Sequence, residues 1–141
     1  MRGLPGSGKS YWVDSFIETL EPEVALQVRQ QGYFSTDSFF MRGEHYIFDK
    51  TRLSEYHQRN LAAFIDALVA KVPVVICDNT NLAQWEYLCY DKAARALGYQ
   101  IRQVLIGDPA DPEHQQICAK RNRHGVPLDK IRAMARQYCV F

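Results

Sequence analysis

The sequence predicts an α/β domain with a mostly parallel sheet, and two observations support this fold class. Segments with apolar residues at helical spacing alternate along the chain with short runs rich in β-branched residues. Such alternation is typical of strand–helix units, in which each helix returns the chain to the same edge of a parallel sheet. The chain has 141 residues, enough to bury a proper core, and we expect a single domain over residues 1–141.

The helices are predicted from their periodicity and from residues typical of helix ends. They are expected at residues 10–20, 21–32, 53–71, 81–97 and 112–122, with a last one starting at Pro127. The first has an apolar stripe of Trp12, Val13, Phe16, Ile17 and Leu20. The long third helix is expected to turn Leu61, Phe64, Ile65, Leu68 and Val69 towards the core. Asn81 is predicted to cap the fourth helix, with Gln84 as its partner. For residues 21–32, a strand over 24–28 is the alternative.

Three strands are predicted, at residues 33–35, 72–78 and 99–107, and residues 41–51 are expected to form a loop. The run at 72–78 is almost continuously β-branched, which is typical of a strand buried on both faces. Ligands of parallel α/β sheets bind at the carboxyl ends of the strands. The polar residues that follow each predicted strand would lie at this edge, so they are the first candidates for a functional site.

Composition excludes several classes of protein. The net charge is +1, so no global basic field points to nucleic acid, although a local basic groove is compatible with it. The cysteines lack metal-ligand spacing, and we expect buried free thiols at Cys77, Cys89, Cys118 and Cys139; a metal site or a disulfide framework is the alternative. No signal peptide and no apolar run near 18 residues long is present, so the expected location is cytoplasmic, without a membrane partner.

The strongest motif lies at the start of the chain, where residues 3–10 read GLPGSGKS. They match G-x-x-x-x-G-K-[ST], the phosphate-binding loop or P-loop. Glycines allow backbone N–H groups to converge on phosphate oxygens, and a following helix points its positive end at the same place. Lys9 supplies charge at the β- and γ-phosphates, and the Ser10 hydroxyl suits Mg²⁺. The predicted nucleotide-binding residues are Gly3, Pro5, Gly6, Ser7, Gly8, Lys9 and Ser10.

Two aspartates follow predicted strands at the same edge of the sheet. Asp78 ends the buried strand, where a carboxylate can hold Mg²⁺ through its water shell; a turn or capping role is the alternative. Asp37 follows the short strand at 33–35, where a carboxylate can orient an acceptor hydroxyl and take its proton; a local turn is again the alternative.

A basic segment near the end of the chain adds candidate charge for the site. Residues 119–136 carry six Lys and Arg residues and one acid. Arg121 and Arg123 stand before Gly125 and Pro127, where a lid could place them over phosphates, and Arg123 is the favoured one. Guanidinium groups suit the charge that develops on a transferring phosphoryl group. A simple solvated helix face is the alternative.

Together these motifs resemble the P-loop polynucleotide 5′-hydroxyl kinases of the T-even phage type and the AAA-domain ATP-binding proteins of the same branch. The matching stretches are RGLPGSGKS, FSTDSFF, YHQRN, VVICDNTNLAQWE and KRNRHGVPLDKIRAM. The resemblance implies a P-loop NTPase, kinase-like three-layer sandwich that binds ATP and Mg²⁺. It also implies that Lys9 and a catalytic acid at Asp37 act with a strand-end acid at Asp78 and a lid arginine at Arg121 or Arg123.

The chain departs from this family at three places. Ser38 stands where the branch often has a second acid, and Phe40 stands where the phage kinases carry an arginine for substrate phosphate, with Arg42 as the nearest substitute. Only Met1 and Arg2 precede Gly3, so the central strand is expected to be truncated. About five to eight apolar residues, one ordinary strand, are expected upstream. The domain is thus expected to be trimmed, and the last helix also stops abruptly.

The function predicted from the sequence is transfer of the ATP γ-phosphate to a hydroxyl group. The 5′-hydroxyl of a polynucleotide is the favoured acceptor, so ATP and a nucleic-acid 5′ end are the expected partners. A small-molecule kinase with the same architecture is one alternative. The other is a non-catalytic ATP-binding module in which Asp37 has only a structural role.

Overall fold

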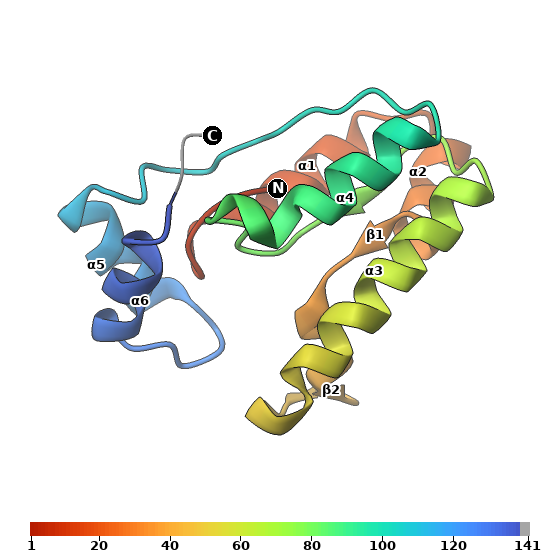
Figure 1. Cartoon of the computed structure of the whole chain (residues 1–141). Helices are drawn as coiled ribbons and strands as arrows, with labels where there is room; N and C mark the ends of the chain where they lie inside the picture. The colour runs from red at the N-terminus through yellow and green to blue at the C-terminus, as the bar shows by residue number, and fades with distance from the viewer. Residues whose placement is uncertain (139–141) are drawn as a thin grey trace.

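The structure is a computed structural model that describes residues 1–138, and it is a mixed α/β domain (Figure 1). Its α-helices are α1 (Lys9–Glu18), α2 (Pro22–Gln31), α3 (Leu53–Val69), α4 (Gln84–Ala96), α5 (Pro112–Arg121) and α6 (Leu128–Ala135). Its strands are β1 (Tyr33–Phe34), β2 (Met41–Arg42), β3 (His45–Tyr46) and β4 (Ile76–Cys77). Two 3₁₀ turns, η1 (Thr36–Phe40) and η2 (Lys50–Arg52), complete the order. The α/β class with a parallel sheet is therefore confirmed.

The sheet is small, and the start of the chain lies inside it. β1 pairs in parallel with β4, with Tyr33 opposite Ile76. On the other side of β4, the Met1 amino group donates to the Cys77 carbonyl at 2.9 Å. Arg2 forms an isolated parallel bridge to Leu105. The order across the sheet is thus β1, β4, residues 1–2 and residues 104–106, which places the residues before the phosphate loop in the middle.

Helices cover both faces of this sheet because successive strand residues point to opposite sides. Tyr33 and Ile76 pack against α1 and α2, in a cluster centred on Val13, Ile17 and Val28. Phe34 and Cys77 pack against α3 and α4, in a cluster centred on Phe64, Leu68, Tyr90 and Ala94. In Figure 1, α1 and α2 accordingly lie behind β1, whereas α3 and α4 lie on the near side.

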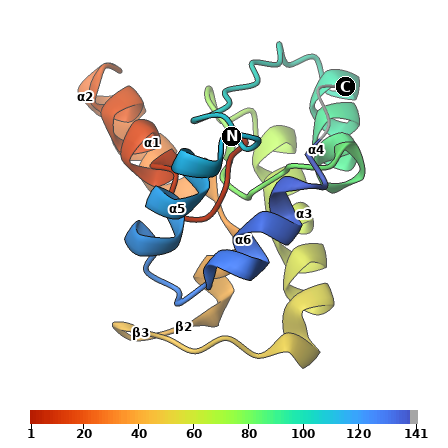
Figure 2. The same ribbon diagram turned by 90° about the vertical axis from the view of Figure 1, so that its left-hand side faces the viewer.

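A third cluster joins the phosphate loop to the C-terminal helices. Leu4 is buried against Leu82, Cys118 of α5 and Ile131 of α6. Figure 2 shows α5 and α6 side by side, with the loop between them reaching towards the β2–β3 hairpin. The segments that carry Asp37, Arg121 and Arg123 therefore surround one end of the sheet.

Several predicted elements differ in the structure. Residues 41–51 contain the antiparallel β2–β3 hairpin rather than a simple loop. Residues 99–107 pair only at Leu105, opposite Arg2. β4 is shorter than 72–78 and matches the two residues of β1, with which it pairs. The strand alternative for 24–28 is wrong, since α2 covers those residues.

Individual core and cap predictions also need correction. Val69 is 63% exposed, although it continues the apolar spacing of α3. Asn81 does not cap α4: its backbone is left-handed, with φ +47°, and its side-chain amide donates to the Met1 carbonyl. The cap region of α4 instead uses Glu86, which accepts from the Ala83 N–H at 2.7 Å.

The structure confirms the predicted burial of the cysteines only in part. Cys118 is buried, but Cys89 is exposed, which contradicts its predicted burial, and Cys77 is half-buried. Cys139 lies outside the described residues. Within residues 1–138 these thiols are free and no cluster of potential metal-binding side chains occurs. None of the described helices has the length and apolar character needed to span a bilayer.

Candidate nucleotide-binding site

The loop that precedes α1 has the geometry of a phosphate cradle. Gly6 and Gly8 have φ values of +82° and +104°, which L side chains rarely adopt, and α1 begins directly after them at Lys9. The Gly3 N–H donates to the Thr80 carbonyl at 2.9 Å, which fixes the start of the loop to the segment after β4. The N–H groups of the first turn of α1 therefore face the mouth of the loop with the positive end of the helix dipole.

Gly6 also allows the loop to contact α5 closely. A Cβ atom on Gly6 would lie 2.4 Å from the Cys118 carbonyl oxygen and 2.8 Å from the Asn122 backbone nitrogen. A Cβ on Gly8 would lie 3.8 Å from a guanidinium nitrogen of Arg121. The phosphate loop is thus packed on the C-terminal end of α5, and Arg121 lies beside it.

The Lys9 ammonium group lies over its own loop. Its Nζ donates to the carbonyls of Gly3 at 3.1 Å and Leu4 at 3.0 Å. Burial lowers the pKa of Lys9, while the negative charges of Asp78 and Asp37 act in the opposite direction. Both aspartates are therefore close enough to interact with this ammonium group.

Asp78 is buried next to the loop and is only 5% exposed. Its Oδ2 accepts from the Tyr33 hydroxyl at 2.6 Å and from the Ser10 hydroxyl at 3.0 Å. Its Oδ1 is buried without a hydrogen-bond partner among the described residues. A buried, unpartnered carboxylate oxygen beside a serine hydroxyl fits a hard cation that prefers oxygen ligands. Asp78 and Ser10 are therefore suited to hold Mg²⁺.

Asp37 lies in η1, three residues after the end of β1. Its side chain is 54% exposed, so it is open to a substrate. The Tyr46 hydroxyl donates to Oδ1 at 3.2 Å, and Nδ1 of His124 lies 3.4 Å from Oδ2. Asp37 is thus an exposed carboxylate near Lys9, with contacts to both the hairpin and the α5–α6 loop.

Phe39, two residues after Asp37, stacks on the buried Tyr56, and three arginines gather around this pair. Arg59 lies over the rings of Phe39 and Tyr56, at 5.1 and 5.8 Å from their centroids. Arg52 lies 5.1 Å from the centroid of the Tyr56 ring and forms an ion pair with Glu55. Arg42 donates to the Tyr56 hydroxyl at 3.0 Å. We call this set of five residues the arginine–aromatic surface.

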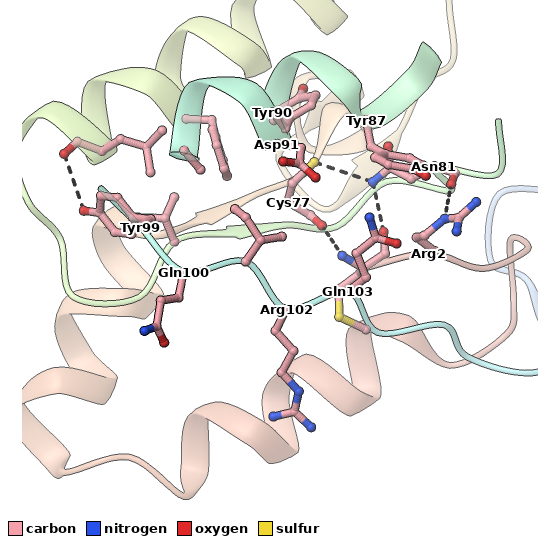
Figure 3. Close-up of a pocket in the computed structure, with 16 residues that line it drawn as sticks. Arg2, Cys77, Asn81, Tyr87, Tyr90, Asp91, Tyr99, Gln100, Arg102 and Gln103 are labelled. Atoms are coloured by element: carbon pink, nitrogen blue, oxygen red, sulfur yellow. Dashed lines mark hydrogen bonds between the residues drawn. The ribbon is translucent and has the colours of Figure 1, made fainter. Parts of the chain in front are cut away.

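A separate cavity of about 120 Å³ lies between β4, α4 and residues 99–103 (Figure 3). Neither the phosphate loop from Gly3 to Ser10 nor Asp37 or Asp78 lines it. The Cys77 carbonyl accepts from the Met1 amino group on one side of this gap, and the Val104 carbonyl accepts from the Arg2 backbone N–H on the other. By the two-residue alternation of strands, backbone groups of Val75 and Arg102 face the same gap. It is therefore a gap in the sheet and no part of the phosphate site.

The structure brings most of the predicted site residues to one end of the sheet. Ser10 contacts Asp78, Lys9 lies near both aspartates, and Arg121 lies beside Gly8, whereas Arg123 is exposed in the loop after α5. Pro5 and Ser7 lie within the loop, and the buried Ser7 hydroxyl has no hydrogen-bond partner in residues 1–138.

Sequence reasoning missed Tyr33, Tyr46 and His124, each of which contacts one of the two aspartates. Only Tyr33 carried a local signal, since it starts the strand that delivers Asp37. Burial and Asp78 raise the pKa of Tyr33, so its phenol stays protonated and donates to the carboxylate.

A glycine-rich loop before a helix, a lysine at its mouth and a strand-end carboxylate define a P-loop nucleotide-binding domain of kinase-like type. The family model described as "AAA domain" matches residues 1–140, and the chain belongs to this family. The chain is 34% identical over 140 residues to NEDD4-binding protein 2 of Homo sapiens. That match covers 98% of the chain but only 7% of the human protein. The resemblance to AAA-domain ATP-binding proteins is confirmed at the level of the family.

Proposed function

We propose that this domain transfers the γ-phosphate of ATP to a hydroxyl acceptor, and that the acceptor is the 5′-hydroxyl of a polynucleotide. The observation that carries the proposal is the placement of Asp37. It is an exposed carboxylate at the end of the sheet that also carries the phosphate loop, and its negative charge favours the charged form of Lys9.

On the donor side, the loop from Gly3 to Ser10 binds the ATP phosphates through its backbone N–H groups. Lys9 turns from the carbonyls of Gly3 and Leu4 to the β- and γ-phosphates, an exchange that gives its buried charge a full anionic partner. Ser10 and Asp78 would hold Mg²⁺, which when bound neutralises charge on the β- and γ-phosphate oxygens.

On the acceptor side, Asp37 orients the acceptor hydroxyl and takes its proton. The acceptor oxygen forms a bond to the γ-phosphorus, the bond from that phosphorus to the β–γ bridging oxygen breaks, and ADP leaves. The hydroxyl proton passes to the Asp37 carboxylate, so charge and atoms balance. General-base assistance of this kind contributes about 10²–10⁴-fold to a rate.

Arg121 and Arg123 supply positive charge for the transferring phosphoryl group. Arg121 lies beside Gly8 and needs little movement to reach a bound phosphate. Arg123 lies two residues further on, in the loop that also contacts Asp37 through His124. A guanidinium group placed over a phosphoryl group stabilises the charge that develops in transfer.

The arginine–aromatic surface supports a polynucleotide acceptor over a small molecule. Arg42 and Arg59 can neutralise phosphodiester groups, and Phe39, two residues after Asp37 in the chain, offers a half-buried ring on which a base can stack. A free nucleoside would use only a small part of this surface.

The test is a transfer assay with radiolabelled ATP and matched acceptors. A DNA or RNA oligonucleotide with a 5′-hydroxyl is compared with the same oligonucleotide carrying a 5′-phosphate and with a free nucleoside. The Lys9→Met variant, purified in the same way, reports any contaminating kinase. We expect label only on the 5′-hydroxyl oligonucleotides. Preferred transfer to the nucleoside, or ATP binding without any transfer, would contradict the proposal.

A further inference from the structure

Two side chains from distant segments contact Asp37 at the same time. Tyr46 donates from its hydroxyl to Oδ1, and Nδ1 of His124 lies near Oδ2. The rings of Tyr46 and His124 also stack on each other, with centroids 3.7 Å apart and planes inclined by 8°. The three side chains therefore form one closed contact, which we call the Asp37 clamp.

Each partner in the clamp is anchored on its own side. Tyr46 belongs to β3, and its ring packs edge-on against the buried Phe40 at 6.0 Å. His124 belongs to the α5–α6 loop, which Asn122 orders by accepting from the Val126 N–H at 2.8 Å and donating to the Val126 carbonyl at 2.9 Å. The clamp thus joins the hairpin to this loop, as the approach of the two segments in Figure 2 shows.

We propose that Tyr46 and His124 are positioning residues, which hold the Asp37 carboxylate in the orientation needed to receive the acceptor proton. This inference rests on the proposed function, because it assigns Asp37 the role of proton acceptor. It adds two residues to which neither the P-loop motif nor the sequence resemblance assigns a role.

Asp37 needs such support because it lies on a short 3₁₀ turn and its side chain is largely exposed. Without partners it would sample several rotamers, only some of which reach the acceptor. Burial and the Asp37 charge raise the pKa of Tyr46, so its phenol remains a donor. A carboxylate has about four lone-pair sites, so two contacts leave sites free for the acceptor hydroxyl.

The clamp also connects the two halves of the site. Arg123 directly precedes His124, and Arg121 lies beside the phosphate loop. When His124 contacts Asp37, the loop that carries Arg123 and starts directly after Arg121 is held on the acceptor side. The clamp therefore assembles the proton acceptor and the phosphate-binding arginines together.

The kinetic test uses three variants and one matched control. Tyr46→Phe removes only the hydroxyl, His124→Ala removes the imidazole, and His124→Asn keeps a donor near the position of Nδ1. His45→Ala, at an exposed position next to Tyr46 on β3, is the control. We expect Tyr46→Phe and His124→Ala to lower kcat about tenfold, because misplacement of a catalytic group by about an ångström costs up to about 100-fold. KM for ATP should stay within about twofold of wild type, and His124→Asn should recover most of the rate.

A second measurement detects the clamp without any activity. Trypsin cleaves after Arg123, so the rate of this cleavage in the native protein reports how often the loop is free. We expect His124→Ala and Asp37→Ala each to raise cleavage several-fold, the double variant to raise it no further, and His45→Ala to leave it unchanged.

The two measurements separate the failure of this inference from failure of the proposed function. If the wild type transfers no phosphate, the proposed function fails, and the positioning role fails with it whatever the cleavage rates show. If the wild type is active and both Tyr46→Phe and His124→Ala keep a normal kcat, the positioning role alone is overturned. Unchanged cleavage in His124→Ala overturns the clamp itself.

Discussion

The closest packing in the site is between Gly6 and the end of α5, and Gly6→Ala tests it. Two costs add in this variant. A non-glycine residue at φ +82° costs about 1–2 kcal/mol. The new Cβ would also lie 2.4 Å from the Cys118 carbonyl oxygen, and relief of such a clash by a backbone shift costs about 1–3 kcal/mol. The free energy of unfolding should therefore fall by about 2–5 kcal/mol.

Urea denaturation and thermal melting measure this loss, with Gly43→Ala and Gly98→Ala as controls. Both control glycines have positive φ, +65° and +88°, but a Cβ on either meets nothing within 4 Å. The gain from a less flexible unfolded chain is common to all three variants and cancels. We expect Gly6→Ala to melt about 10 °C lower than wild type and clearly below both controls. A loss equal to that of the controls would refute close packing of the phosphate loop on α5.

Three further predictions concern the same end of the sheet. Lys9→Met should abolish ATP binding in a titration yet leave the melting temperature of the free protein unchanged or higher, because burial lowers the pKa of Lys9 and its charge opposes folding. The pKa of Lys9 is lower in the folded than in the unfolded chain, so the free energy of unfolding of the wild type should rise as the pH approaches 10.5, and that of the variant should lack this contribution. Retained ATP affinity in Lys9→Met would contradict the assignment of Lys9 to the phosphate site. Tyr33→Phe removes one of two donors to Asp78 and should lower the free energy of unfolding by about 1–3 kcal/mol in urea, whereas no change would exclude that hydrogen bond as a stabilising one. An extension of about six β-branched apolar residues before Met1 should enter the gap beside Val75 and Arg102 and raise the melting temperature. A polar extension of equal length should leave the melting temperature unchanged, and equal effects of the two extensions would count against strand insertion.

The sequence predicts much of this fold because its strongest signals are local. The amphipathic stripe of α1, the β-branched run that contains β4 and the proline at the start of α5 each depend on neighbouring residues alone. The phosphate loop is likewise a continuous motif. In the candidate site, these local signals are sufficient to place Lys9, Ser10 and Asp78 at one edge of the sheet.

The features that the sequence does not predict depend on contacts between distant segments. The β2–β3 hairpin has strands of two residues, too short for an alternating pattern. Asn81 resembles a helix cap in sequence, but its amide is used to bind the Met1 carbonyl, 80 residues away. His124 sits in a basic run that reads as a solvated surface, and only the fold brings it next to Asp37. Val69 keeps helical spacing but is the last residue of α3 and is exposed, whereas Leu68 before it is buried.

The central claim is that Asp37 accepts the proton of the acceptor hydroxyl, and Asp37→Asn tests it most directly. The change keeps the size of the side chain and one acceptor oxygen but removes its basicity. ATP affinity and the rate of label transfer to a 5′-hydroxyl oligonucleotide are measured on the same preparation. We predict ATP affinity near that of wild type, because Lys9, Ser10 and the loop N–H groups bind the nucleotide, and transfer lower by about two to four orders of magnitude. Near-normal transfer would contradict the claim and leave Asp37 a turn residue, and loss of ATP binding would move it into the metal site with Asp78.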